Sequence, residues 1–215
     1  MQLQIAPSIL SADFLHLDRD IDLLNRHADL IHLDLMDGSF VPNLSFGFPV
    51  VEAVARKARI PMDAHFMVVE PGRWVGRCKD AGIQMMSFHY EAAGRGTAAL
   101  IRSIQAAGMK AGVAIDPDVP VERLYPYIGK ADYFLIMSVF AGFGGQKFIY
   151  ESIDRITALQ ARIQAKGAHT PIEVDGGVDA GNALALKQAG ASILVAGSSV
   201  FHAPDPAAAI AALRV

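Results

Sequence analysis

Short apolar runs rich in branched side chains alternate along the chain with longer amphipathic segments. A short β-branched run indicates a buried strand, whereas apolar residues spaced three to four apart indicate a helix with one face on a core. The strand-like runs lie at residues 3–8, 30–36, 60–67, 84–88, 110–115, 131–137, 171–175 and 191–196. The helix-like segments follow at residues 13–26, 47–58, 71–81, 95–107, 120–129, 150–166, 179–188 and 205–213. The pattern predicts an α/β protein with a parallel sheet.

Eight strand-then-helix units in 215 residues favour a compact (β/α)8 TIM barrel. A doubly wound open sheet is the alternative, because alternation alone does not show whether the sheet closes. No shift in composition and no linker rich in proline or serine marks a boundary within the chain. We therefore expect a single catalytic domain over residues 1–215.

One predicted strand carries side chains that suit a core poorly. On a strand, alternate side chains share a face, so His32, Asp34 and Met36 point one way while aliphatic side chains point the other. Burying an ionised carboxylate is unfavourable unless the group is paired or bound to a metal. We therefore expect this strand to contribute side chains to a functional site.

In a barrel, functional groups gather where the strands end, at the carboxyl face. His32, Asp34, His65 and Asp175 come from three predicted strands and could meet there. Imidazole and carboxylate groups are good ligands for Zn²⁺, and also for Fe²⁺ or Mn²⁺. The other interpretation is that a histidine is a core residue and the aspartates cap helices, because the spacing is not a local metal motif. The metal site is expected only if the barrel forms.

Glycine-rich segments follow the last three predicted strands. Glycine lets the backbone approach a ligand and direct its N–H groups at it, and barrels often bind phosphate in this region. The alternative is that these glycines only form turns. The segments contain Gly142, Phe143, Gly144 and Gly145, then Gly176 and Gly177, then Gly197 and Ser198.

Met36, Met67 and Met137 lie at or near the ends of three predicted strands. Methionine is usually core filler, but here it could also form an apolar wall that keeps water from a reacting centre. His89 and Glu91 are interpreted either as neighbours of the site or as surface residues.

The composition of the chain limits its possible partners and its cellular location. A net charge of −3 gives no basic surplus for nucleic-acid binding. The single cysteine, Cys78, excludes an internal disulfide framework and favours a reducing compartment. No apolar run reaches the ~18 residues of a membrane span, and no signal peptide is evident. We expect a cytoplasmic protein without nucleic-acid or membrane partners, and a homo-oligomer is plausible if the barrel exposes an apolar patch.

Six segments in order, spread from about residue 5 to residue 201, resemble the ribulose-phosphate 3-epimerase family. They are Ala6–Asp13, His32–Gly38, Phe40–Asn43, Asp63–Met67, Gly142–Phe148 and Glu173–Gly177. Several such motifs in the right order are far more specific than a lone glycine pattern.

The resemblance implies a (β/α)8 barrel that binds one divalent metal ion per subunit, Zn²⁺ first, with Fe²⁺, Mn²⁺ or Co²⁺ as alternatives. It implies His32, Asp34, His65 and Asp175 as metal ligands. Asp34 and Asp175 would also form the acid–base pair, and Ser8 and His65 would contact substrate. The implied substrate and phosphate segments are Gly142 to Gly145, Asp175 to Gly177, and Gly197 with Ser198, and Met36, Met67 and Met137 would line the site.

The implied activity is that of an isomerase in the pentose phosphate pathway, interconverting D-ribulose 5-phosphate and D-xylulose 5-phosphate by proton transfer at C3. A sister epimerase for D-allulose 6-phosphate is the first alternative. A sugar-phosphate-binding barrel without activity is the second, although binding alone does not need paired acid–base groups. A metal-dependent hydrolase is the third.

Three places depart from the family pattern. Phe66 replaces a leucine, and the segment that begins at Asp116 replaces an asparagine-proline start. Phe140 and Ala141 stand where the family usually has a polar residue and a proline. None of these departures removes a ligand or a catalytic aspartate, but they bear on the shape of the pocket.

Overall fold

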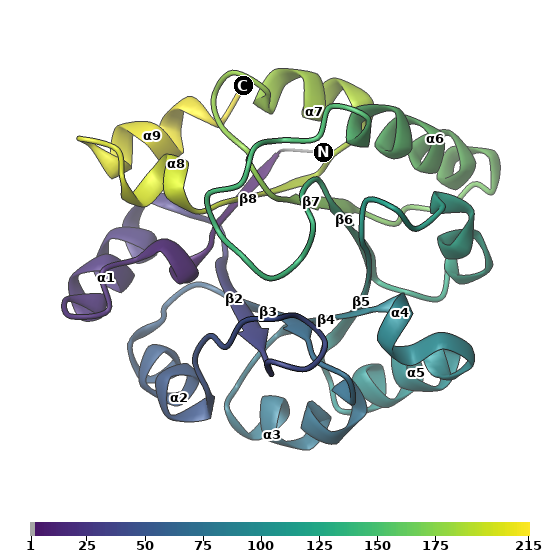
Figure 1. Ribbon diagram of the computed structural model, residues 1–215, viewed down its shortest axis with the longest axis horizontal. Helices are drawn as coiled ribbons and strands as arrows, with labels where there is room; N and C mark the ends of the chain where they lie inside the picture. Colours follow the sequence, from purple (N-terminus) through teal and green to yellow (C-terminus); the bar gives the residue numbers. More distant parts are fainter. Residues whose placement is uncertain (1–2) are drawn as a thin grey trace.

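Eight parallel strands form one sheet that curls into a barrel, and the helices surround it on the outside (Figure 1). The computed structural model describes residues 3–215, so residues 1–2 of the expected domain lie outside it. The strands are β1 (Gln4–Pro7), β2 (Ile31–Met36), β3 (Met62–Met67), β4 (Met85–His89), β5 (Lys110–Ile115), β6 (Tyr133–Met137), β7 (Ile172–Asp175) and β8 (Ile193–Ala196). All eight predicted strands are confirmed, with bounds that differ by two residues at most.

Most of the α-helices overlap predicted amphipathic segments, but the two shortest, at residues 90–93 and 198–201, do not. They are α1 (Leu17–His27), α2 (Phe48–Lys57), α3 (Val75–Asp80), α4 (Tyr90–Ala93), α5 (Thr97–Ala106), α6 (Ser152–Ala165), α7 (Ala183–Ala189), α8 (Ser198–Phe201) and α9 (Pro206–Ala212). The 3-10 helices are η1 (Ile9–Ser11), η2 (Pro71–Trp74), η3 (Gly94–Gly96) and η4 (Val121–Tyr127). Within residues 3–215, each helix is too short or too polar to cross a membrane.

Two of the differences between predicted and observed helices have a clear local reason. The helix expected at 13–26 begins only at Leu17, because the Asp13 carboxylate accepts the N–H of Leu15 at 3.0 Å and holds a turn before it. The helix expected at 120–129 is the short 3-10 helix η4, which contains Pro126. Proline has no N–H and disrupts an α-helical interior.

The barrel is nearly closed, and its seam lies between β1 and β2. The first strand pairs with the last, Pro7 beside Ala196, so the order is that of a barrel and not of a doubly wound sheet. Across the seam, Ser8 and His32 form an isolated parallel bridge. One side of the seam is therefore β2, the strand that carries His32 and Asp34.

Strand alternation divides the side chains between two environments. Ile31, Leu33 and Leu35 of β2 belong to the main apolar core that packs between the sheet and the helices. His32 and Asp34, on the other face of the same strand, are also buried, with 0% and 4% of their surface exposed. The interior of the barrel is thus partly polar, as the alternation in β2 predicts.

Space inside the barrel is tight where β5 faces the Tyr133 side chain. A methyl group on Gly112 would lie 2.3–2.7 Å from three atoms of the Tyr133 ring. Tyr133 is 1% exposed, and its hydroxyl donates to Asp63 Oδ1 at 2.7 Å. The absence of a side chain at Gly112 makes room for this buried bond.

Gly112→Ala is therefore expected to destabilise the protein by about 1–3 kcal/mol through overpacking. For a chain of this size, each kcal/mol lowers the unfolding temperature by roughly 2–4 °C. The matched control is Gly76→Ala in α3, where an added methyl group meets nothing within 4 Å. Thermal unfolding of both variants tests this, and equal unfolding temperatures for the two would contradict it.

Candidate active site

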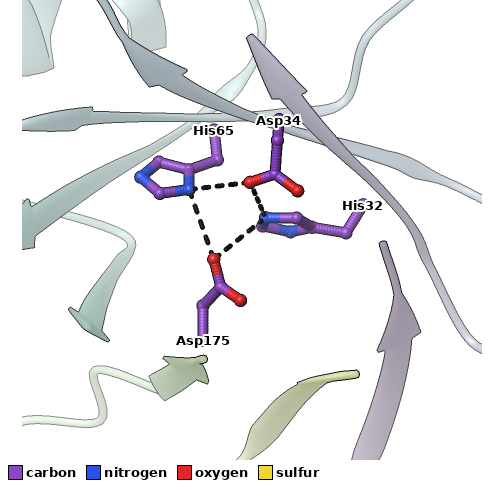
Figure 2. Close-up of side chains that lie close together, drawn as sticks. All are labelled: His32, Asp34, His65 and Asp175. Carbon is purple, nitrogen blue, oxygen red and sulfur yellow. Dashed lines mark hydrogen bonds and ion pairs between the residues drawn. The ribbon is translucent and has the colours of Figure 1, made fainter. Parts of the chain in front are cut away.

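Four titratable side chains meet inside the carboxyl end of the barrel (Figure 2). His32 and Asp34 come from β2, His65 from β3 and Asp175 from the last position of β7. His65 Nδ1 lies 3.2 Å from Asp34 Oδ1 and 3.5 Å from Asp175 Oδ2. His32 Nε2 lies 3.4 Å and 3.8 Å from the same two oxygens. The structure brings together all four residues that the sequence assigned to a metal site.

The geometry of this cluster fits a divalent metal ion. Zinc bonds of roughly 2.0–2.1 Å in a tetrahedral arrangement place neighbouring ligand atoms about 3.3–3.4 Å apart, close to the separations above. His32 Nε2 is fully buried and has no hydrogen-bond partner within residues 3–215. A buried polar atom without a partner is rare and points to a missing ligand. The donor set is compatible with a divalent metal ion and does not by itself select one.

His32 is oriented from behind by a buried carboxylate. Its Nδ1 lies 2.7 Å from Asp63 Oδ2, and Asp63 also accepts the Tyr133 hydroxyl. Asp63 therefore fixes the ring with Nε2 facing the cluster, as carboxylates beside metal-binding histidines commonly do.

The contacts between the histidines and the aspartates determine which groups of the cluster are protonated. Burial by itself lowers the pKa of His65, but its hydrogen bonds to Asp175 and Asp34 outweigh burial and raise the pKa to about 9. The pKa of His32 is also raised well above its usual value, because the Asp34 charge outweighs burial. Burial raises the pKa of Asp34, but the charge of His32 and the close contacts of the carboxylate with both histidines hold that pKa well below its usual range. Without a metal, the histidines therefore hold protons and Asp34 is ionised.

A further acid, Glu173, lies deeper in the barrel. Its carboxylate oxygens have no hydrogen-bond partner in the part of the chain that the structure describes, and Oε1 lies 3.6 Å from His32 Nδ1. Burial and the neighbouring Asp63 charge raise the pKa of Glu173 to about 8. A neutral Glu173 at pH 7 avoids placing two buried carboxylates side by side.

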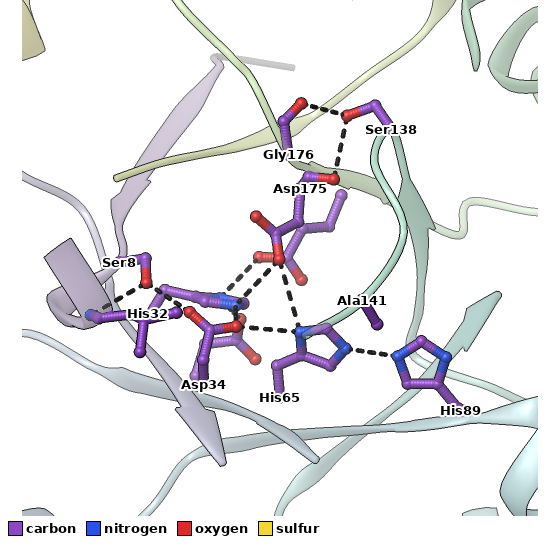
Figure 3. A network of polar contacts seen from close by, with 12 residues as sticks. Ser8, His32, Asp34, His65, His89, Ser138, Ala141, Asp175 and Gly176 are labelled. Carbon is purple, nitrogen blue, oxygen red and sulfur yellow. Dashed lines mark hydrogen bonds and ion pairs between the residues drawn. The ribbon is translucent and has the colours of Figure 1, made fainter. Parts of the chain in front are cut away.

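Ser8 and Ser138 hold the two aspartates from outside the cluster (Figure 3). The Ser8 hydroxyl donates to Asp34 Oδ2, the oxygen that the histidines leave free, and accepts the N–H of Leu10. The Ser138 hydroxyl lies 3.0 Å from the carbonyl oxygen of Asp175 and 2.6 Å from that of Gly176. Ser138 thus fixes the main chain at the point where β7 ends.

A pocket opens above the cluster, and the predicted substrate-binding residues surround it. Its lining includes Ser8, Asp34, Met36, Met67, Met137, Gly142, Phe143, Gly144, Gly145, Asp175, Gly176, Gly177, Gly197 and Ser198. His65, which was also expected to contact substrate, is fully buried and lies outside this lining. The three methionines are buried side chains in the pocket wall, where they limit the access of water.

The glycines of the pocket loops have conformations that other residues adopt poorly. Gly142, Gly176 and Gly177 have φ values of +120°, +118° and +63°. A methyl group on Gly177 would lie 2.6 Å from the backbone nitrogen of Phe148. These loops need glycine for their shape, so turn formation and ligand binding are compatible explanations for the same residues.

Two residues that support the cluster, Asp63 and Glu173, were not predicted from the sequence. Asp63 and Glu173 stand two positions before His65 and Asp175, so strand alternation places each on the same face as a proposed ligand. That spacing is the signal that could have found them. His89, for which a surface position was one interpretation, is fully buried and lies 2.9 Å from His65 through their Nε2 atoms, so the surface interpretation is wrong.

Comparisons with known proteins give a consistent answer. The model of the ribulose-phosphate 3-epimerase family matches residues 4–201. Ribulose-phosphate 3-epimerases from Mycobacterium tuberculosis and Bacillus subtilis are 43% and 41% identical to the chain. The first match covers 98% of this chain and 91% of the relative, and the second covers 99% and 98%. The cytoplasmic isoform from Oryza sativa is 40% identical over 98% of this chain and 92% of that protein.

Solved structures confirm the barrel. A 3-hexulose-6-phosphate synthase matches with a TM-score of 0.71 at 19% identity, over 100% of this chain and 98% of that one. KGPDC from Streptococcus mutans matches with a TM-score of 0.74 at 13% identity, over 99% and 96%. At these identities the likeness shows the fold alone. The family match and the curated relatives go further, and by them the chain belongs to the ribulose-phosphate 3-epimerase family.

Proposed function

We propose that this chain is an isomerase that interconverts D-ribulose 5-phosphate and D-xylulose 5-phosphate by proton transfer at C3. The observation that carries the proposal is the meeting of two carboxylates, Asp34 and Asp175, at one pocket with two histidines. Inversion at a carbon atom needs one group to remove a proton from one face and another to deliver a proton to the opposite face. The relatives named above support this reaction, and no feature of the pocket favours the six-carbon sugar or a silent binder.

The two aspartates are suited to act from different sides of a substrate. Asp34 comes from β2 and Asp175 from β7, strands that β1 and β8 separate in the barrel. In one direction, ionised Asp34 removes the C3 proton and protonated Asp175 supplies a proton from the other face. In the reverse direction the roles exchange, so the two carboxyl groups must differ by one proton in each working state.

The residues that would hold a divalent metal are His32 through Nε2, His65 through Nδ1, Asp34 through Oδ1 and Asp175 through Oδ2. A bound metal would act as a Lewis acid toward the negative charge that develops on the substrate oxygens. Zn²⁺ is proposed first, and Fe²⁺, Mn²⁺ and Co²⁺ are the alternatives, because imidazole and carboxylate donors can bind each of them.

The pocket walls have separate roles in the proposal. Met36, Met67 and Met137 cannot ionise, so they keep the centre dry without competing for the transferred proton. The segments Gly142–Gly145, Gly176–Gly177 and Gly197–Ser198 direct backbone N–H groups at the phosphate of the substrate. The loop around Phe143, whose side chain is 53% exposed, closes over the bound phosphate and excludes water.

We infer a cytoplasmic location from the single buried cysteine, Cys78, and from the relative named as a cytoplasmic isoform. We propose an association between copies of the chain because Leu15 and Leu44 are 89% and 71% exposed and their two segments meet, with the Phe14 and Phe46 ring centroids 5.7 Å apart, so that the exposed apolar side chains lie in one region of the surface.

Asp175→Asn is expected to reduce epimerisation by roughly 10²–10⁴-fold, because one of the two proton-transfer groups is removed. The native protein in D₂O is expected to form product that carries deuterium at C3, and NMR of the sugar phosphate measures this. The matched control is Asp179→Asn, where the asparagine oxygen can still accept the N–H groups of the turn that Asp179 holds. Native product without deuterium at C3 would rule out the two-carboxylate scheme.

Metal uptake is expected to release protons at pH 7. His65, with a pKa of about 9 in the absence of metal, must lose its Nδ1 proton before it can bind a metal. Apparent affinity is then expected to rise from pH 7 toward pH 9, by about tenfold per pH unit for each displaced proton. Calorimetric titration in buffers of different ionisation enthalpy counts the protons. A proton count of zero at pH 7 would be inconsistent with the proposed ligands.

A further inference from the structure

A line of polar contacts leaves the cluster at His65 and continues to His89 (Figure 3). His65 Nε2 lies 2.9 Å from His89 Nε2. The two ring planes are 20° apart with centroids separated by 5.0 Å, and the rings meet edge to edge. This is a hydrogen bond between two imidazoles, so one nitrogen donates and the other accepts.

The direction of that bond follows from the cluster. His65 directs Nδ1 at Asp34 and Asp175, so Nδ1 is its metal-facing atom. A neutral imidazole that binds a metal through Nδ1 carries its proton on Nε2. His65 Nε2 is then the donor, and His89 Nε2 must accept.

The proton of His89 is then on Nδ1. This atom is fully buried and has no hydrogen-bond partner among the residues that the structure describes. The nearest anion is Glu91, whose Oε1 lies 3.6 Å away. Glu91 is held in place because the same oxygen accepts the N–H of Asp116 at 2.8 Å. The unpartnered nitrogen thus faces a fixed carboxylate, whose negative charge favours keeping the proton on Nδ1.

The same residues could be interpreted as a second metal site, since donor atoms of His89, Glu91 and Asp116 lie within 4.8 Å of one another. A metal on His89 Nδ1 would place the His89 proton on Nε2. Two N–H groups would then face each other across the 2.9 Å contact with His65. A neutral His65 cannot bind one metal while His89 binds another, so the trio supports the first centre and does not form a second.

The line continues to the glycine loop of the pocket. Asp116 Oδ1 accepts the N–H of Ala141 at 3.2 Å, one residue before Gly142. The guanidinium of Arg155 donates to the Asp116 carbonyl oxygen at 2.7 Å. Ala141 stands where the resembling family usually has a proline, which has no N–H to donate. In this chain the contacts therefore extend from His65 to the start of the loop.

We propose that His89 is a positioning residue which, backed by Glu91, holds His65 in the Nε2-protonated tautomer and so prepares Nδ1 for the metal. The inference rests on the proposed function, because it concerns the same metal centre. His89 contacts His65 only through Nε2, which is not the proposed metal-binding atom, and it does not line the pocket.

The test compares Zn²⁺ dissociation constants, measured by competition with a chromogenic chelator, for the native protein, His89→Phe and His89→Gln. Phenylalanine keeps the packing of an aromatic ring beside Phe40, whose centroid lies 4.9 Å from that of His89, but removes the acceptor. Loss of a partner that orients a metal ligand weakens binding by roughly 10–100-fold, which is the expected result for His89→Phe. His89→Gln is expected to recover most of this loss, because an amide oxygen can accept the His65 proton. The control is His169→Gln, an exposed histidine far from the line in sequence.

A second measurement does not depend on any variant folding. Nitrogen-15 NMR of histidine-labelled, Zn²⁺-loaded native protein reports which ring nitrogen carries each proton. The expected result is a proton on Nε2 of His65 and on Nδ1 of His89. A proton on Nε2 of His89, or equal Zn²⁺ affinity for native protein and His89→Phe, would overturn the inference and leave the proposed function intact. A native protein that binds no Zn²⁺ would overturn both.

Discussion

Charged groups inside the barrel are tolerated only because they neutralise and orient one another. Asp34 and Asp63 are buried, and the neighbouring histidines hold the pKa of each carboxyl below its usual value. Asp63 contacts His32, and Asp34 contacts His65. A single buried carboxylate without such a partner would be strongly unfavourable. The pairing in turn requires that β2 and β3 lie in one register, with His32 beside Asp63 and Asp34 beside His65. The site therefore depends on the register of β2 and β3. It also depends on the closure of the barrel, which places Ser8 beside His32.

The apolar side chains of the strands therefore point outward toward the helices, and the polar side chains of the cluster point into the barrel. The outward faces of the strands pack against the helices and supply the apolar burial that stabilises the fold. The inward faces can then hold the polar cluster of the site. Each histidine of the cluster has its second nitrogen satisfied from a different side, His32 by Asp63 and His65 by His89. The two rings are therefore oriented independently, and both face the same point.

Much of this arrangement could be predicted from the sequence because strand periodicity fixes which side chains share a face. The alternation in β2 marked His32 and Asp34 as functional before any neighbour was known. Periodicity does not show which side chain of another strand lies opposite, so the Asp63–His32 and His65–His89 contacts needed the structure. The position of Glu173 on the same face as Asp175 could be read from alternation, but its neighbours His32 and Asp63 lie on other strands, so those contacts also needed the structure. The 3-10 helix η4 was missed because its apolar spacing resembles that of an α-helix, although Pro126 was visible in the sequence.

The central claim is that the four-residue cluster binds a divalent metal which this chain needs for epimerisation. The most direct test is a coupled assay of the purified protein with D-ribulose 5-phosphate before chelation, after exhaustive chelation and after addition of a single divalent metal. The account predicts that turnover disappears when the metal is removed and returns when about one equivalent per subunit is restored. Full turnover by protein shown to be free of metal would contradict it.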